Sequence, residues 1–374
     1  MAVPSYNRVS IDLAALRQNF AAIKAWVGPD VQVMAIVKSN AYGHGLVPAA
    51  KAFAASGAST FGVAEVEEAV ALREAGLAGD IVVLLGAPPE AAAEVVRHRL
   101  SPVVFDHECL ASLSKAAVAG QQVKVHLKVD VGMGRIGVLP SQVMEMVRAI
   151  KETPGLSLAG LLSHFPAADQ EGGETLAQGE EFQRLARQVA GLLPEQPVLH
   201  IANSAALLRL RATHASMVRP GISLYGYAPS AVSCRPEVVL KPAMSFCSRV
   251  LQVKEVPAGY GVSYGHRFVT RRPTRLAVLP VGYDDGYLRC LTGKAQVLIR
   301  GQRAPVVGTV CMNACMADIT GIAGVMPGDE VVLMGKSGVE TISAEEIAGW
   351  MGTISYEVLC LFGSRNRAVY SEAV

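Results

Sequence analysis

Several features that would place the chain in a special class are missing from its 374 residues. No run of about 18 consecutive apolar residues is present, so we expect no membrane span. Residues 1–10 lack a charged segment followed by an apolar one, and we expect no secretory leader. Lys and Arg number 34 against 32 Asp and Glu. This balance excludes the polybasic footprint of a nucleic-acid-binding protein and favours a small-molecule ligand.

Cysteine is also scarce, with seven residues scattered along the chain. An odd number without regular spacing does not resemble a disulfide framework, so we expect a reducing, cytoplasmic location. The one close pair, Cys311 and Cys315, lacks a second pair of ligands, and we expect no metal site there. Hydrophobic residues make up 51% of the chain and charged residues 18%, which is a globular composition of about two domains.

From residue 31 to about 225, short β-branched runs alternate with segments of helical periodicity. In residues 64–76, for example, apolar positions recur at every third and fourth residue. Alternating β and α units predict a parallel sheet. About eight units favour a closed (β/α)₈, TIM-like barrel, with an open doubly wound sheet as the alternative. The runs are VQVMAIV (31–37), STFGVA (59–64), DIVVLLG (80–86), SPVVF (101–105), VKVHLKVD (123–130), LSLAGLL (156–162), PVLHIA (197–202) and MVRPGISLYG (217–226).

After about residue 240 the pattern changes to strands punctuated by Gly and Pro. In this region only residues 345–352 have the pattern of a helix, and residues 5–12 have the pattern of one further strand. We therefore predict an α/β protein with a barrel domain at 10–240. A C-terminal, mainly-β domain would comprise 241–374 together with residues 1–9.

In a (β/α)₈ barrel, catalytic residues gather at the carboxyl ends of the strands. Lys38 follows the apolar run AIV, and burial there would favour a neutral amine able to react with a carbonyl. Arg219 precedes Pro-Gly, and a turn of that composition can bind a phosphate through backbone N–H groups. Ser204 opens a helix and could donate its hydroxyl to the same anion. A solvated lysine and an ordinary helix cap are the alternatives for Lys38 and Ser204.

Other candidate side chains follow or lie within neighbouring runs. Residues 132–137, GMGRIG, match the G-x-G-x-x-G pattern, but no acidic residue follows at the spacing of a dinucleotide site. We interpret this loop as presenting Arg135 to a carboxylate. Lys128, if it points into the barrel, needs a partner or a changed charge, and His164 ends the next run. Tyr264 lies between glycines in the β region, where a turn alone does not explain an exposed aromatic ring.

Together these segments resemble the alanine racemase family of pyridoxal-phosphate (PLP) enzymes. The resemblance implies a PLP-binding barrel, a C-terminal β domain and a homodimer with active sites at the subunit interface. It spans nearly the whole chain in family order. The matching motifs are AIVKSNAYGHG (35–45), GMGRIGV (132–138), LLSHFPAAD (161–169), HIANSAA (200–206), RPGISLYG (219–226), VSYGHRF (262–268), VGYDDGY (281–287) and SYEVLC (355–360).

The resemblance also implies which residues hold the cofactor. Lys38 would bind PLP covalently, and Arg219 would contact the pyridine nitrogen. His164 would join the hydrogen-bond network around Arg219. The cofactor phosphate would be held by Tyr42, Ser204, Gly221, Ile222 and Tyr356.

For the substrate, the resemblance implies two bases on opposite faces of the amino acid, Lys38 and the partner subunit's Tyr264. Arg135 and the backbone of Met312 would bind the substrate carboxylate. Lys128 matches a lysine that is carbamylated in many relatives. The implied reaction is the interconversion of L-alanine and D-alanine, which supplies D-alanine for peptidoglycan.

Two positions depart from the family pattern. Asn313 stands where relatives commonly have Asp, and Asp284 stands where many have a small residue. These departures leave open a broader-specificity racemase, or one that prefers serine or lysine. A non-catalytic PLP-binding protein is a second alternative, and the additional β domain with Tyr264 argues against it.

Overall fold

The computed structural model describes residues 5–118 and 120–372. These residues form two compact units. The barrel unit comprises Ala14–Ala41 and Leu46–Lys241. The β unit comprises the described residues up to Leu13, Tyr42–Gly45 and those from Pro242 onward. Within the described ranges, every helix is too short or too polar to traverse a membrane.

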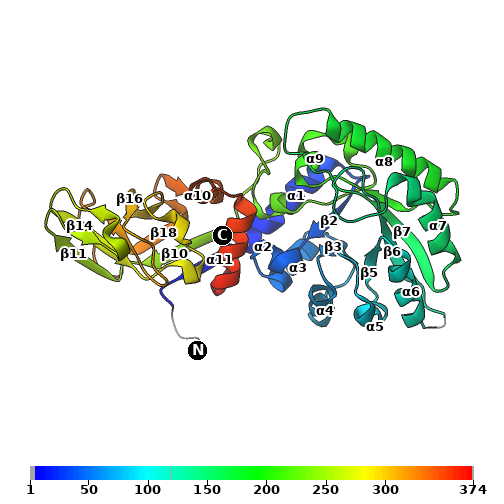
Figure 1. Cartoon of the computed structure of the whole chain (residues 1–374), viewed down its shortest axis with the longest axis horizontal. Coiled ribbons are helices and arrows are strands. Elements are labelled where there is room, and N and C mark those ends of the chain that lie inside the picture. Colours follow the sequence, from blue (N-terminus) through cyan, green and yellow to red (C-terminus); the bar gives the residue numbers. More distant parts are fainter. Residues whose placement is uncertain (1–4, 119, 373–374) are drawn as a thin grey trace. The chain divides into compact units, whose positions relative to one another are not determined.

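The barrel unit is a closed barrel of parallel strands (Figure 1). The strands pair in chain order, and the last one closes on the first. The predicted (β/α)₈ barrel is therefore confirmed, and the open sheet is excluded. The strands are β2 (Gln32–Ile36), β3 (Thr60–Val63), β4 (Asp80–Val83), β5 (Ser101–Val104), β6 (Val123–Lys128), β7 (Leu156–Leu162), β8 (Val198–His200) and β9 (Met217–Val218).

Helices cover the outside of the barrel, because each crossover buries one apolar face against the strands (Figure 1). In α7 the buried residues Val143, Met146, Val147 and Ile150 recur at every third and fourth position. The helix predicted at 64–76 forms at Val66–Glu74. The barrel helices are α1 (Leu13–Val27), α3 (Leu46–Ala55), α4 (Val66–Glu74), α5 (Ala92–Arg97), α6 (His107–Ala116), α7 (Val143–Glu152), α8 (Glu174–Ala190) and α9 (Ser204–Arg209).

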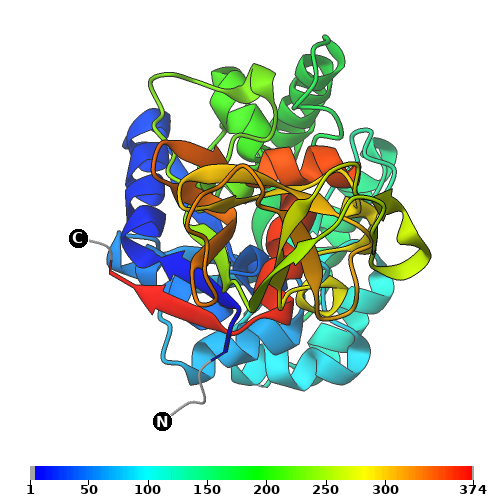
Figure 2. The same cartoon turned by 90° about the vertical axis from the view of Figure 1, so that its left-hand side faces the viewer.

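The β unit is built on a ten-stranded sheet. Strand β1 (Arg8–Asp12) pairs antiparallel with β10 (Met244–Arg249) and parallel with β20 (Ala368–Ser371), as Figure 2 shows in blue and red. The predicted additional strand at 5–12 is thus confirmed. The other strands of the unit are β11 (Gln252–Val256), β12 (Gly261–Val262), β13 (Phe268–Val269), β14 (Thr274–Leu279), β15 (Gln296–Ile299), β16 (Gln302–Val307), β17 (Cys315–Asp318), β18 (Glu330–Ser337) and β19 (Glu340–Ile342).

The β unit has two helices where the sequence pattern indicated one. Helix α10 (Ala344–Met351) lies at the predicted place, but α11 (Ser355–Arg365) was not predicted, so the expectation of a single helix is wrong. Helix α11 buries Val358, Leu359 and Phe362, and the Phe362 ring lies 4.8 Å from that of Phe246, centroid to centroid. The three- and four-residue spacing of these apolar side chains outweighs the strand preference of Tyr356 and Val358.

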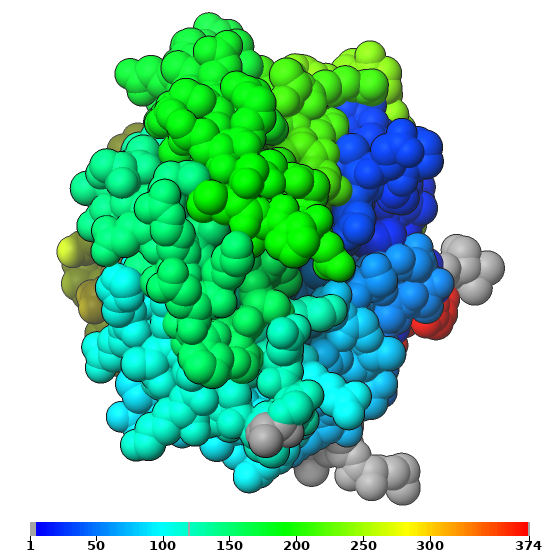
Figure 3. Space-filling model, turned by 90° about the vertical axis from the view of Figure 1, so that its right-hand side faces the viewer, coloured from blue at the N-terminus to red at the C-terminus, as the bar shows by residue number. Residues whose placement is uncertain are grey.

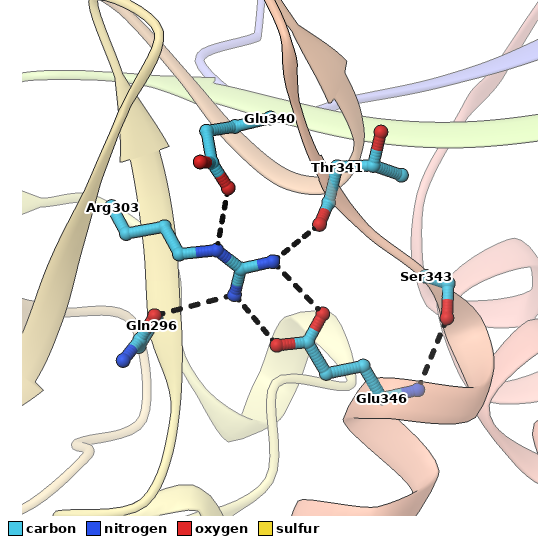
Figure 4. A network of polar contacts seen from close by, with 6 residues as sticks. All are labelled: Gln296, Arg303, Glu340, Thr341, Ser343 and Glu346. Atoms are coloured by element: carbon cyan, nitrogen blue, oxygen red, sulfur yellow. Dashed lines mark hydrogen bonds and ion pairs between the residues drawn. The ribbon is translucent and has the colours of Figure 1, made fainter.

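Arg303 is the centre of a polar cluster that fastens β16 to β19 and α10 (Figure 4). Its Nε donates to Glu340 Oε2 at 2.8 Å, and its Nη1 donates to Glu346 Oε1 at 2.6 Å. Its Nη2 donates to the backbone oxygen of Thr341. Hydrogen bonds to Glu346 and Glu340 raise the pKa of Arg303. This guanidinium therefore bridges three elements of the β unit.

Candidate active site

Positive charge gathers at the carboxyl ends of the barrel strands. Lys128 ends β6 and is 8% exposed. Burial lowers the pKa of Lys128 well below its ordinary value, and the charges of Arg219 and Arg135 lower it further. Lys38 acts in the same direction, whereas Asp130 opposes it. The barrel unit thus holds several cations close together, which suits a ligand that carries more than one anionic group.

Lys38 begins α2 (Lys38–Tyr42), which is a single turn of left-handed helix. The three residues after Lys38 have φ between 53° and 56°. Left-handed helix costs roughly 1–2 kcal/mol per L-residue, so the surroundings must hold this turn. Glu68 Oε1 accepts the N–H of Ser39 at 2.6 Å and that of Asn40 at 3.3 Å. Backbone strain of this kind concentrates at functional sites.

Arg219 is buried, and its contacts are neutral groups. Its guanidinium donates to the backbone oxygens of Ser163 and His200. It also donates to Nδ1 of His200 at 3.2 Å and to Nδ1 of His164 at 3.3 Å. Because guanidinium only donates, both imidazoles accept at Nδ1 and carry their proton on Nε2. The structure therefore brings Arg219 and His164 together.

The charge states in this cluster follow from burial. Burial lowers the pKa of His164 to about 2, with the charges of Arg219 and Lys128 acting in the same direction. Burial also lowers the pKa of Arg219 to about 9. At neutral pH, Arg219 is charged and His164 is neutral.

Two buried histidines of the same network were not predicted. His200 ends β8, and its Nε2 donates to Nδ1 of His126 in β6 at 2.9 Å. Burial, followed by the charge of Arg219, lowers the pKa of His126 to about 4 and that of His200 well below its ordinary value. His200 sits at a strand end and His126 alternates with Lys128. The sequence signals for them are the strand end at His200 and the alternation of His126 with Lys128.

Ser204 begins α9 and contacts the turn that follows Arg219. Its Oγ accepts the N–H of Gly221 at 2.9 Å, and it also accepts the N–H and hydroxyl of Ser223 at 3.3 and 3.0 Å. The Ser204 hydroxyl keeps one proton, which can rotate between Ser223 Oγ and an anion bound at this turn. Ile222 begins a 3₁₀ helix, Ile222–Tyr225, so its N–H has no acceptor inside that helix. Ser204 and the following turn form an anion-binding corner.

Asp130 shapes the loop that carries Arg135. Its carboxylate accepts the N–H groups of Gly132 at 2.9 Å, Met133 at 2.7 Å and Arg135 at 3.0 Å. Burial alone would raise the pKa of Asp130, but the backbone donors outweigh it and lower the pKa overall. The glycine-rich loop therefore folds around its own aspartate and carries Arg135 close enough for its charge to act on Lys128.

In the β unit, Tyr42 and Tyr356 lie together, with ring centroids 5.9 Å apart. Their contact depends on two glycines, because a Cβ on Gly43 would meet Leu359 O at 2.4 Å and one on Gly363 would meet Gly43 O at 1.9 Å. Burial, followed by the nearby Tyr356, raises the pKa of Tyr42. Tyr42 is therefore a neutral phenol that can donate a hydrogen bond.

Tyr264 and Met312 lie on adjacent exposed loops of the β unit, 71% and 54% exposed. Ser263 Oγ donates to Thr309 O, and Thr309 Oγ1 donates to Tyr264 O, both at 2.7 Å. The loop is thus held by hydrogen bonds while its aromatic side chain projects into solvent. The side chains of Tyr264 and Met312 therefore form an exposed apolar surface on these two loops.

The two positions that depart from the family pattern are hydrogen-bonded to each other. Asn313 Nδ2 donates to Asp284 Oδ2 at 3.3 Å. Their loops are also joined by backbone bonds of 3.1 Å, from Tyr283 N to Cys311 O and from Asp284 N to Met312 O. A carboxylate is therefore still present beside Met312, but Asp284 supplies it instead of residue 313.

Comparisons with known proteins agree with this arrangement. Residues 11–229 match the family model described as "Alanine racemase, N-terminal domain", and residues 243–370 match "Alanine racemase, C-terminal domain". A protein named alanine racemase from Syntrophobacter fumaroxidans is 42% identical over 367 residues, which is 97% of this chain and 96% of the relative.

Two solved structures are also similar. The alanine racemase of Bacillus anthracis with bound L-Ala-P has a TM-score of 0.92 and 34% identity, covering 99% of this chain and 96% of that one. The alanine racemase of Bartonella henselae with covalently bound pyridoxal phosphate has a TM-score of 0.88 and 28% identity. It covers 98% of this chain and 100% of that one.

Proposed function

Because the chain belongs to the alanine racemase family, we propose that it interconverts L-alanine and D-alanine with PLP as cofactor. The observation that carries this proposal is the cluster of cations at the carboxyl ends of the barrel strands. PLP carries a phosphate and alanine a carboxylate, and both are attracted to such a cluster. The product, D-alanine, would serve peptidoglycan synthesis. The cations are Lys38, Arg135 and Arg219.

The anion-binding corner fits the cofactor phosphate. The Ser204 hydroxyl would turn its proton toward the phosphate, while the N–H of Gly221 holds its oxygen at 2.9 Å. The N–H of Ile222, at the start of its 3₁₀ helix, would donate as well. The phenols of Tyr42 and Tyr356 would add donors from the β unit. Lys38 would hold the cofactor covalently through its amine. The chemistry that PLP supplies when bound is an electron sink that makes the Cα–H bond of an attached amino acid acidic.

Arg219 would face the pyridine nitrogen of the cofactor. It keeps its proton at neutral pH, and its neighbours His164 and His200 are neutral imidazoles. A donor that retains its proton leaves the pyridine nitrogen unprotonated. This weaker electron sink favours prompt return of a proton to Cα over transamination.

Racemisation requires one base on each face of Cα. We assign these roles to Lys38 and to the partner subunit's Tyr264. The exposed Tyr264 lies on a hairpin with two further exposed apolar residues, Tyr260 at 46% and Val269 at 49%, which supports a homodimer with shared active sites. Arg135 and the backbone of Met312 would bind the substrate carboxylate.

Lys128 would act as a carbamate. Its lowered pKa favours the neutral amine, which adds to carbon dioxide and releases a proton. The resulting anion would balance the charges of Arg135 and Arg219. Carbon-13 NMR of the protein under labelled carbon dioxide should show a carbamate resonance that is lost in Lys128→Met.

All seven cysteines lie within the described ranges, and none forms a disulfide. This supports a reducing location, and we place the protein in the cytoplasm. In this proposal residues 10–240 bind the cofactor, and residues 241–374 with 1–9 supply Tyr264 and Met312.

The proposal is tested by incubating the PLP-loaded protein with each L-amino acid in deuterated water and analysing chirality and deuterium at Cα. Alanine should exchange fastest and become a mixture of enantiomers. Faster exchange of serine or lysine would assign a different specificity, for which the Asn313–Asp284 pair is the structural candidate. A protein that binds PLP but exchanges no Cα proton would be a carrier instead.

Two variants test the assigned bases. Lys38→Ala should lose the cofactor that borohydride fixes to the wild-type chain. Tyr264→Phe should impair exchange from one enantiomer of alanine more than from the other. Equal loss from both enantiomers would contradict the assignment of one base to each face.

A further inference from the structure

A pocket of about 610 Å³ opens at the amino-terminal ends of barrel strands β4, β5 and β6. Lys124 near the start of β6 lines it, whereas Lys128 ends the same strand at the proposed active site. The pocket therefore lies at the other end of the barrel from the cofactor site. Its volume falls within the range of small-molecule sites. Residues near position 100, cyan in Figure 3, form part of the surface of the barrel unit.

The lining of the pocket combines an apolar wall with an excess of positive charge. The apolar side chains include Val95, Leu100 and Val123, all buried. Four fixed cations line the pocket, and Asp80 is its one carboxylate within the described chain. The cations are Arg73, Arg97, Arg99 and Lys124. Since the whole chain has a formal net charge of only +2, this is a local concentration of charge.

Two of these cations have no counterion among the residues that the structure describes. Arg97 pairs with Glu94 at 2.9 Å, so its charge is balanced. For Arg99 and Lys124, both exposed, no ion pair is found within residues 5–118 and 120–372. A ligand in the pocket would therefore meet two cations that are free to pair with it.

The backbone of Arg99 has a strained, left-handed conformation at a position where the two preceding helices have glycine. Arg99 follows α5 with φ of 49°, and its N–H and that of the next residue donate to carbonyls in the last turn of α5 at 3.2 and 2.9 Å. Helices α3 and α4 end in the same motif, but there the left-handed residue is Gly57 or Gly76. Helices α3 and α4 place glycine at this left-handed position, whereas α5 places Arg99 there. This departure points to a function for the Arg99 side chain.

Arg73 holds this turn in place. Its Nε donates to His98 O at 3.0 Å, and its Nη2 donates to Arg99 O at 3.3 Å. Its Nη1 donates to Leu77 O at 2.9 Å. The Arg73 guanidinium is therefore occupied by backbone carbonyls and acts as a positioning residue, which fixes Arg99 at the pocket.

We propose that this pocket binds a small phosphorylated anion of about nucleotide size, with Arg99 and Lys124 as the recognising side chains. The guanidinium fork matches two phosphate oxygens, and the ammonium pairs with a third. Gln121 and Gln122 also line the pocket, and their amides can donate further hydrogen bonds to the ligand. A concave site with two unpaired cations in a chain of balanced charge suits a small anion better than a nucleic acid.

The test is isothermal titration of the PLP-loaded protein with inorganic pyrophosphate, without divalent cations and at about 0.15 M salt. We expect one saturable site per chain. Arg99→Gly and Lys124→Ser should each weaken binding at least about tenfold, because each removes a charged hydrogen-bond donor. Arg99→Gly also removes the backbone strain, so its melting temperature should equal or exceed that of the wild type. Loss of binding in this variant then cannot be loss of fold.

A matched control removes two exposed cations elsewhere on the barrel, Lys51 on α3 and Arg148 on α7. The double variant Lys51→Ser/Arg148→Ser should bind pyrophosphate like the wild type, and all variants should retain alanine racemisation. The proposal is overturned if the wild type shows no saturable binding, if Arg99→Gly binds unchanged, or if the control weakens binding equally. Tighter, Arg99-dependent binding of a DNA oligonucleotide than of pyrophosphate would assign the pocket to nucleic acid instead.

Discussion

Replacing Gly363 by alanine tests the close approach between α11 and the segment that carries Tyr42. The new Cβ would lie 1.9 Å from Gly43 O, 2.4 Å from Gly43 C and 2.5 Å from its Cα. Non-bonded contacts of this kind need more than 3 Å, so backbone must move by about 1 Å or more. Overpacking a tight contact costs about 1–3 kcal/mol, and here both partners are backbone. We therefore expect destabilisation of about 3 kcal/mol, the upper end of that range.

The measurement is urea unfolding of the PLP-loaded protein followed by circular dichroism, together with the dissociation constant of PLP. Displacing α11 separates Tyr356 from Tyr42, so PLP affinity should fall as well. Gly349→Ala in α10 is the matched control, because its Cβ would meet nothing within 4 Å. It should stabilise by about 0.5–1 kcal/mol through helix propensity. If Gly363→Ala also stabilises, the inferred contact between α11 and Gly43 is wrong.

Three further changes test other parts of the structure. Ser204→Ala should weaken PLP binding to the apoprotein about 10- to 100-fold, because a donor to a charged group is lost, while circular dichroism stays unchanged. Asp130→Asn should lower stability at pH 7 by about 1 kcal/mol, allowing for solvent screening. Because the folded pKa of Asp130 lies below its unfolded value, this contribution is present above the unfolded pKa. In urea unfolding at a series of pH values, the difference from wild type should shrink as pH falls below about 4. Arg303→Ala should destabilise the β unit by about 1–2 kcal/mol, since two partly exposed carboxylates lose their shared partner. Arg97→Ala, at a single exposed pair, should change thermal stability by less than about 1 kcal/mol.

The barrel could be predicted from the sequence because each strand is a short apolar run bounded by polar residues, and every such run forms a strand. The last run, 217–226, is paired only at Met217–Val218, because Pro220 cannot donate to a ladder and the chain then turns into a 3₁₀ helix. Helix α11 was missed because its residues Tyr356 and Val358 favour strands, and burial against Phe246 decides the outcome.

The candidate site was predictable only in part. Strand ends point to Lys38, His164 and Arg219 without any structure. The left-handed turn after Lys38 has no sequence signal, because it depends on Glu68, which is 29 positions beyond Ser39. The tautomers of His200 and His164 likewise depend on three-dimensional contacts with Arg219.

Strand β1 has a consequence for the order in which the protein assembles on the ribosome. It is the first strand synthesised, yet its partners β10 and β20 emerge only with residues 244–249 and 368–371. Most barrel strands pair with strands that are synthesised next to them in the chain, so the barrel can form on the nascent chain. During that time both edges of β1 remain unpaired. Hydrogen exchange on stalled chains should show amides of β1 unprotected until translation is almost complete. A chain that terminates before β20 would leave one edge of β1, the first strand to be synthesised, without a hydrogen-bonded partner.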